Sequence, residues 1–233
     1  MRTSNQTGII ARSRDNLLCL LLALLAVFAL DSSAQQEWDL QRDRNGIQVY
    51  TKAVAGSPYA AVRTVTVLDD IRLSALVALL EDVTACSEWA DKCAESFVYE
   101  RVTETESYIY THNALPFPVK DRDHLSHVRW SQDTATLTVI MESTATEGIM
   151  EKRSGLLRIT ESDIVWRFVP RPTGMVEIIN EAHINPGSSL PAWVTNMLLI
   201  DTPYQTMQSF ITEARKPKYQ NASVNFVREP NTR

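Results

Sequence analysis

The sequence predicts an α+β fold in which an antiparallel sheet is covered on one side by helices. Residues 96–184 consist mostly of short runs that alternate apolar and polar residues, which is typical of strands with one buried face. The connections between these runs are short and polar, so consecutive strands should pair in antiparallel order. An amphipathic segment follows at residues 190–215, and its wide apolar face predicts a long helix that covers the sheet.

Two strands and a helix are expected before the main run of strands. The turn signal Asn45-Gly46 introduces the first strand, and β-branched residues mark the second. Asp69–Leu80 should be a helix with leucines on one side and Asp69 or Asp70 as its N-cap. Residues Trp38–Arg42 should form a short helix or a turn. The expected strands are 47–51, 59–68, 97–103, 107–113, 123–131, 136–142, 153–160, 163–169 and 175–184.

The final helix has its own start and break signals. Ser188 or Ser189 should cap its first N–H groups, and Pro191 suits its first turn. Pro203 removes one backbone hydrogen bond inside the helix, so a kink is expected there. An apolar helix over a concave sheet can enclose a cavity, which indicates binding of an apolar molecule. Steps of four and three place these residues on one face: Trp193, Met197, Ile200, Tyr204, Met207, Ile211 and Ala214.

The first 34 residues have the layout of a secretory signal peptide. Arg2, Arg12 and Arg14 make a basic leader, and Leu17–Leu30 is an apolar run without charge. Small residues before Ala34 suit cleavage after that residue. The apolar run is shorter than the ~20 residues of a comfortable membrane span. An uncleaved N-terminal anchor is the alternative.

The rest of the chain suits one exported domain. Cleavage after Ala34 leaves 199 residues, enough for a substantial core. The leader takes three Arg and two Asp with it, so 20 basic and 26 acidic residues give a formal net charge of −6. This balance argues against nucleic acid as a partner. We expect a signal peptide at 1–34, a domain at 35–215, a disordered tail at 216–233, and a periplasmic or secreted monomer.

Two cysteines remain after cleavage, Cys86 and Cys93. In an exported protein such a pair is a disulfide candidate. On one continuous helix their separation of seven residues would be about 10 Å, too far for a bond. The bond therefore requires the preceding helix to end near Thr84, and two free, partly buried thiols are the alternative. The spacing matches no zinc motif, and we expect no metal and no cofactor.

Five segments in order resemble the START family, the steroidogenic-acute-regulatory-protein-related lipid-transfer domains, and in particular its exported bacterial branch. Family members often have Asp and Gly where this sequence has Asn185 and Ser188, and all four residues suit a turn. The resemblance implies a helix-grip fold, in which the sheet curls around the final helix and leaves a tunnel for one lipid. It implies binding or transfer, and it does not carry over the identity of the ligand. The segments are Gly46–Tyr50, Asp82–Cys93, Pro116–Asp123, Val165–Pro170 and Asn185–Asn196.

Two polar residues are candidates for ligand contact. Asn180 is an amide on the otherwise apolar face of strand 175–184, where it could hold a ligand hydroxyl or carbonyl. The alternative is a structural hydrogen bond to the helix or to water. Arg122 could anchor a polar head group, or it could form a structural ion pair with Glu142 or Glu147.

Large apolar side chains form the second group of candidates. Tyr110, Trp130 and Trp193 combine an aromatic ring with a polar atom, which suits a lipid cavity. Met197 and Met207 on the final helix suit a pliable cavity wall. Ordinary core packing is the alternative for each aromatic residue.

Catalytic patterns are not found in the sequence, so we expect no catalytic residues. The four histidines, including His124, are expected at the surface, and no serine has a Gly-x-Ser-x-Gly setting. The predicted function is therefore binding, with possible transfer, of a lipid or other apolar small molecule, and with transient membrane contact. A cavity enzyme of the polyketide cyclase or aromatase type needs an acid–base pair inside the cavity. That enzyme and a ligand sensor that acts through a partner protein are the alternatives.

Overall fold

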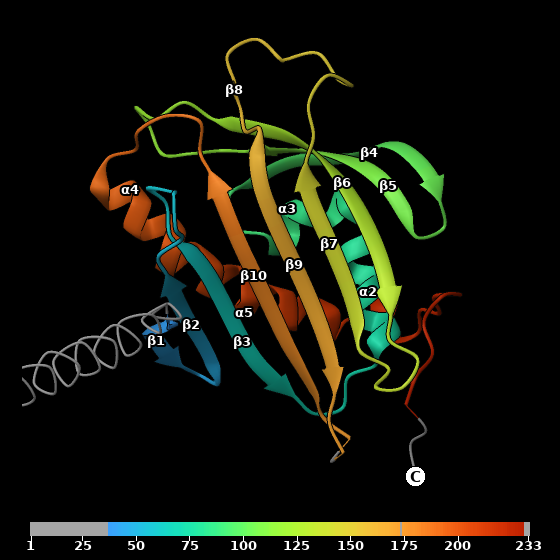
Figure 1. Ribbon diagram of the computed structural model, residues 1–233. Coiled ribbons are helices and arrows are strands. Elements are labelled where there is room, and N and C mark those ends of the chain that lie inside the picture. Colours follow the sequence, from blue (N-terminus) through green and yellow to red (C-terminus); the bar gives the residue numbers. More distant parts are fainter. Residues whose placement is uncertain (1–36, 173, 231–233) are drawn as a thin grey trace, which may run out of the picture. The chain divides into compact units, whose positions relative to one another are not determined.

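A sheet of ten strands is the main element of the computed structural model, which describes residues 37–172 and 174–230 (Figure 1). Nine of these strands follow the order β1-β2-β3-β10-β9-β7-β6-β5-β4, and neighbours pair in antiparallel fashion. The short strand β8 lies off this path and pairs in parallel with β6. The predicted signal peptide lies outside the described residues. The strands are β1 Asp39–Arg44, β2 Ile47–Lys52, β3 Ala61–Leu68, β4 Cys93–Thr103, β5 Glu106–Asn113, β6 Arg122–Gln132, β7 Val139–Ala145, β8 Leu157–Arg158, β9 Glu161–Pro170 and β10 Val176–Asn185.

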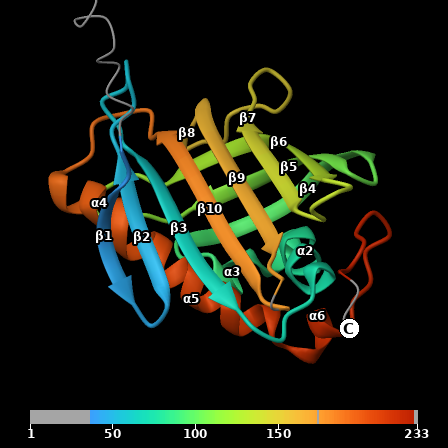
Figure 2. The ribbon, with the colours of Figure 1, turned by 60° about the horizontal axis from the view of Figure 1, so that its bottom comes forward.

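Helices α2, α3 and α5 lie on one side of the sheet, as the two ribbon views agree (Figures 1 and 2). We call the face of the sheet on that side the inner face. The α+β class is confirmed, and so is a C-terminal helix that packs against an antiparallel sheet. The helical segments are α2 Leu73–Glu81, η1 Val83–Ala85, α3 Cys86–Trp89, α4 Ala192–Asn196, η2 Met197–Asp201, α5 Thr202–Ala214 and α6 Pro217–Gln220.

Strand β10 joins the two parts of the sheet. It pairs with β9, which precedes it in the chain, and with β3 from the N-terminal part. Its alternate residues Val176 and Ile178 are buried in the core, and Ile178 lies opposite Thr66 and Phe168. Alternation with a period of two places these residues on the inner face, which explains why the last strand occupies a central position.

Several local predictions differ from the structure. Trp38–Arg42 is neither helix nor turn, because residues 39–44 form strand β1 against β2. The expected strand 153–160 is reduced to Leu157–Arg158. The residues before it form a loop, in which Gly148 and Gly155 adopt positive φ angles of 79° and 84°. Such angles interrupt an extended strand.

The N-terminus of α2 is capped by a residue far away in the sequence. The helix begins at Leu73, so Asp69 and Asp70 lie too early to cap it. Instead the Glu229 carboxylate accepts hydrogen bonds from the backbone N–H groups of Leu73 at 3.0 Å and Ser74 at 2.8 Å. A negative charge at this position also interacts favourably with the helix dipole.

The prediction of a disordered tail after Arg215 is wrong for the part of it that the structure describes, residues 216–230. This part contains α6, and Tyr219 is buried against the core. The Phe226 ring centroid lies 5.9 Å from that of Trp130. The segment has no helical or strand periodicity because its apolar residues contact the core one at a time, so only tertiary contacts order it.

The final helix changes its winding before Pro203. Residues Met197–Asp201 form a π-helical turn, and Pro203 lies in the first turn of α5. Helices commonly bend at π turns and at proline, where backbone hydrogen bonds are interrupted. The predicted serine cap is not formed, since Pro191 occupies the N-cap position. The Ser188 hydroxyl instead accepts a hydrogen bond from Arg122 at 3.1 Å.

A disulfide bond joins Cys86 and Cys93, whose Cα atoms lie 5.9 Å apart. Cys86 begins α3 and Cys93 begins β4, so the two residues are not on one continuous helix. The bond requires the preceding helix to end near Thr84, and α2 does end before it, at Glu81. The bond fixes α3 to the edge strand of the sheet.

Candidate ligand-binding site

One half of the inner face is filled by large side chains from the sheet and the helices. Trp166 and Phe168 of β9 pack against Phe210 of α5, and the Trp166 and Phe210 ring centroids are 4.8 Å apart. Trp89 of α3 adds an edge-on contact with Phe210 at 5.3 Å. Aromatic pairs at these separations are well packed. This half of the interior is therefore closed by protein side chains.

Burial decreases along the same strands toward the other half. On the inner face of β10, Val176 and Ile178 are buried, whereas Asn180, Ala182 and Ile184 are half-buried. Ile164 lies opposite Ala182 on β9 and is also half-buried. Because these side chains point toward the helices, their remaining exposure shows that the helices cover this half incompletely. This half of the inner face is the candidate binding site.

Five buried polar atoms have no hydrogen-bond partner within residues 37–172 and 174–230, and three of them belong to neighbouring strands. Ser126 and His124 lie on the inner face of β6, because they alternate with residues that face outward and share their face with the core residue Trp130. Ser107 on β5 lies opposite Val128, next to Ser126 on the same face. The five atoms are Ser107 Oγ, Ser126 Oγ, His124 Nδ1, Thr64 Oγ1 and Trp89 Nε1.

These groups carry no charge at neutral pH. Burial lowers the pKa of the His124 imidazole to about 4, and the Asp123 carboxylate offsets only part of this effect. The prediction of a surface position is thus wrong for His124. Alternation along strand 123–131 places His124 on the same face as Trp130, so the sequence did contain this signal.

Arg122 is buried at the start of β6 and holds the loop that leads into α4. Its guanidinium donates hydrogen bonds to the backbone carbonyl of Lys120 and to Ser188 Oγ, and Pro186 O is 3.5 Å from its Nε. Burial lowers the pKa of this group. The expected ion pair is not formed within the described parts of the chain: Glu142 instead lies 3.8 Å from Arg129, and Glu147 forms no ion pair there. Neutral oxygen atoms of a loop therefore replace the predicted carboxylate.

Tyr110 lies on the opposite face of the sheet, so its prediction as a cavity residue is wrong. It lies opposite Leu125 on β6, and Leu125 points to the other face of the sheet from its neighbour Ser126. Its hydroxyl donates to Asp123 Oδ2 at 3.2 Å, and the Arg153 guanidinium lies 4.4 Å from its ring centroid. Asp123 also forms a buried ion pair with Arg158 at 2.9 Å. The loop 146–156 covers this outer cluster.

The other predicted site residues are divided between core, surface and candidate site. Trp130 and Met207 are buried in the closed half, where Trp130 Nε1 donates to Glu81 Oε1 at 2.6 Å. Trp193 is 52% exposed, on α4. Met197 is half-buried in η2. Among the described residues, the Asn180 side chain makes one hydrogen bond, a long one of 3.4 Å to Val165 O. Asn180 thus keeps hydrogen-bonding capacity on the candidate site's face.

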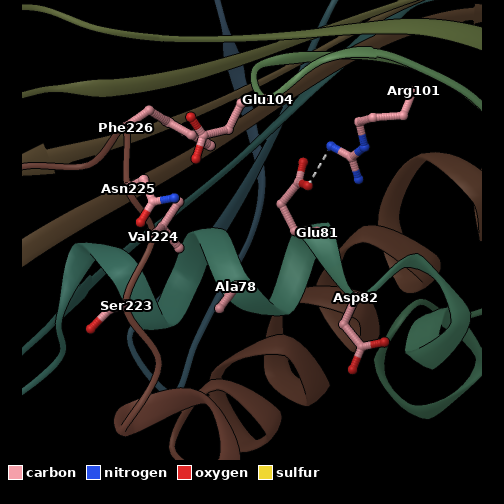
Figure 3. A pocket seen from close by; sticks show the side chains of 9 residues that line it. All are labelled: Ala78, Glu81, Asp82, Arg101, Glu104, Ser223, Val224, Asn225 and Phe226. Carbon is pink, nitrogen blue, oxygen red and sulfur yellow. Dashed lines mark hydrogen bonds and ion pairs between the residues drawn. The ribbon is translucent and has the colours of Figure 1, made fainter.

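A hollow lies between α2, the end of β4 with the turn that follows it, and residues 223–226 (Figure 3). Two of the carboxylates in its wall already have partners. Glu81 pairs with Arg101 at 2.8 Å, and Asp82 bonds with Lys218 and Tyr219. Charged walls of this kind do not suit a lipid. We therefore interpret this pocket as a gap left where α2 packs against residues 223–226.

Two further findings apply to residues 37–172 and 174–230. There, the His, Cys, Asp and Glu side chains form no group of three or more that could hold a metal ion. No helix there combines the length and the hydropathy that a bilayer crossing requires.

A sheet that grips a C-terminal helix and leaves part of its inner face uncovered defines a helix-grip binding domain. A sequence model of the START domain matches residues 22–209. The chain is 31% identical to protein PA1579 of Pseudomonas aeruginosa over 194 residues, which cover 82% of this chain and 94% of that protein. The protein therefore belongs to the START domain family.

Two further relatives show what the family includes. A crystal structure of a STAR-related lipid transfer protein fragment from Xanthomonas axonopodis is similar, with a TM-score of 0.70 and 29% identity. The match covers 77% of this chain and 99% of that one. The human phosphatidylcholine transfer protein is 22% identical over 167 residues, 70% of this chain and 77% of that protein. Both of these relatives are described as lipid transfer proteins.

Proposed function

We propose that this protein binds one lipid or similar apolar molecule between the inner face of its sheet and its final helix, and transfers it between membranes. The observation that carries this proposal is the loss of burial along β10 from Ile178 to Ile184, under a helix whose winding is irregular. Side chains that face inward and remain partly uncovered provide apolar surface for a ligand. Burial of such surface contributes about 25 cal/mol per Å², so a few hundred Å² would supply several kcal/mol.

Two exposed aromatic residues support membrane contact as part of this function. Phe117 is 94% exposed on the loop between β5 and β6, and Trp193 is 52% exposed on α4. The loop and α4 lie at the same end of the sheet (Figure 1), and Arg122 next to this loop binds the segment before α4. Exposed aromatic rings gain free energy at a lipid interface. A ligand could enter and leave at this end.

Export is the second part of the proposal. The layout of residues 1–34 supports a cleaved signal peptide, and the Cys86–Cys93 disulfide suits an oxidising compartment. Edman sequencing of the protein from the cell envelope should begin at Gln35. An N-terminus at Met1 in membrane fractions would support the uncleaved anchor.

Native mass spectrometry of the protein from its own cell envelope, followed by lipid extraction, tests the binding function. We expect one lipid per protein. An empty protein that leaves every offered lipid unbound would contradict the proposal, and turnover of a polyketide-type substrate would favour a cavity enzyme.

Hydrogen exchange tests whether the final helix opens. We expect the amides of α4 and η2 to exchange faster than those of α5, and to slow when lipid is bound, because the π turn weakens the backbone hydrogen bonds there. Uniform strong protection of residues 190–215, with and without lipid, would contradict this route.

A further inference from the structure

We propose that the interior selects a lipid whose polar group is uncharged, such as a diacylglycerol, and that Ser107, Ser126 and His124 form hydrogen bonds with that group. This inference rests on the proposed lipid-binding function and names the class of ligand. It starts from three buried polar atoms that have no partner in the described residues and that lie on two neighbouring strands.

The three residues form a row on the inner face, with Ser126 between His124 and Ser107. Ser126 and His124 are successive inner-face residues of β6, which places their Cα atoms roughly 7 Å apart. Ile109 lies opposite Ser126, so Ser107 occupies the diagonal position, also at roughly 7–8 Å. Ser107 lies opposite Val128, four residues from His124, so the Cα atoms of Ser107 and His124 are roughly 14 Å apart. The row therefore suits a polar group that carries several oxygen atoms. A ligand with a hydroxyl group and carbonyl oxygens can donate and accept hydrogen bonds there at the same time.

Buried polar atoms without partners are costly, and this cost points to a ligand. A buried hydroxyl or ring nitrogen without a partner carries the full desolvation cost of that group. Ser107 and Ser126 are 1% and 2% exposed, so bulk water does not satisfy them. A cluster of such atoms is expected where a bound molecule supplies the missing partners.

The surroundings of the cluster disfavour a charged head group. Charged side chains on the inner faces of the described strands already have partners. Arg122 binds the loop before α4, Arg101 lies opposite Ser107 and donates to Glu81 at 2.8 Å, and Arg42 donates to Asp201 at 2.7 Å. His124 is neutral, because burial lowers its pKa to about 4. Among the packed helices, Glu81 is paired with Arg101 and Glu213 with Lys216. A phosphate there would have to break one of these pairs or be buried without a counter-charge, at a high desolvation cost.

Apolar side chains next to the cluster suit the rest of such a lipid. Ile109 separates Ser107 from Thr111 on β5 and is half-buried. Ile164, Ala182 and Leu199 are half-buried and pack against the core. Hydrocarbon chains bound there would bury these remaining surfaces.

A lipid-extraction experiment tests the inference. The mature protein is incubated with vesicles that contain equimolar dioleoylglycerol, phosphatidylcholine, phosphatidylethanolamine and phosphatidylglycerol, re-isolated, and analysed by native mass spectrometry and lipid extraction. We expect dioleoylglycerol to be bound at least about 10-fold in preference to each phospholipid, which corresponds to about 1.4 kcal/mol. Equal or preferential binding of a phospholipid would overturn the inference but leave the proposed function intact. Failure to bind any of the four lipids would overturn both.

Alanine variants show whether the cluster is responsible. Ser126→Ala and Ser107→Ala should each reduce the preference for dioleoylglycerol about threefold or more. Neither should lower the melting temperature of the lipid-free protein, because each removes an unsatisfied group. Ser131→Ala is the matched control, on an exposed position of the same strand β6, and should retain the preference. Unchanged preference in both cluster variants would contradict a role for these hydroxyls.

Discussion

Replacing Asp123 by Asn tests how strongly the outer face of the sheet depends on one buried ion pair. Asp123 and Arg158 side chains are 1% and 3% exposed, and Arg158 Nε and Nη2 both donate to the carboxylate at 2.9 Å. Arg158 also donates to the backbone carbonyls of Met150 and Glu151 at 3.2 Å. The substitution leaves a buried guanidinium without its counter-charge, and also weakens the attachment of the loop 146–156.

The expected loss is about 3–5 kcal/mol of unfolding free energy, the usual effect of removing one partner from a buried pair. For a domain of this size, each kcal/mol lowers the melting temperature by about 2–4 °C, so a decrease of roughly 6–20 °C is expected. Urea unfolding followed by circular dichroism measures the free energy. Arg129→Gln is the matched control: its pair with Glu142 spans 3.8 Å with side chains 58% and 55% exposed, and should contribute under about 0.5 kcal/mol.

The effect should also depend on pH. Burial raises the pKa of the Asp123 carboxyl, but hydrogen bonds and the positive charge of Arg158 lower it by more, so the folded-state pKa is below the ordinary value. Its stabilising contribution is therefore complete above about pH 4 and disappears as the pH falls through the folded-state pKa. The difference between the wild type and Asp123→Asn should be largest at pH 7 and smaller at pH 3. A loss below about 1 kcal/mol at pH 7, similar to that of the control, would show that the buried pair does not stabilise the fold as expected.

Three further predictions concern other parts of the molecule. Glu229→Ala should lower the unfolding free energy by about 1–2 kcal/mol, because α2 loses the cap on two N–H groups; no change in urea unfolding would contradict this cap. Replacing Cys86 and Cys93 together by Ser should cost about 2–3 kcal/mol, as measured by urea unfolding, and the effect should vanish when both proteins are compared under reducing conditions. Phe117→Ala and Trp193→Ala should reduce binding to neutral vesicles in a flotation assay while the melting temperature stays unchanged, and wild-type vesicle binding by both would argue against membrane contact at this end.

The fold class followed from periodicity, because alternation with a period of two is a local property of each strand. Most strand positions were predicted within a few residues. The ordered structure of segment 217–230 was not predicted, because its contacts are single long-range interactions such as that of Glu229 with the start of α2. A carboxylate that caps a helix about 155 residues away leaves no local pattern in the sequence.

The candidate site was harder to predict than the fold. Asn180 was placed on the inner face by alternation, and it lies there with one long hydrogen bond. Tyr110 was wrongly assigned, because both faces of its strand carry buried residues: the loop 146–156 covers the outer face. Burial on both faces removes the simple contrast between inside and outside on which such predictions depend.

Order and spacing along the chain were enough to predict the α+β class, the START-family resemblance and which residues of β10 share a face. Three properties required the folded structure: which polar atoms have no partner in the described residues, which half of the interior the helices leave uncovered, and the binding of Arg122 to a loop. Those properties depend on contacts between segments distant in sequence, such as Ser107 with β6 and Arg122 with Ser188. Their free energies arise from the three-dimensional surroundings of each group, and no local pattern encodes those surroundings.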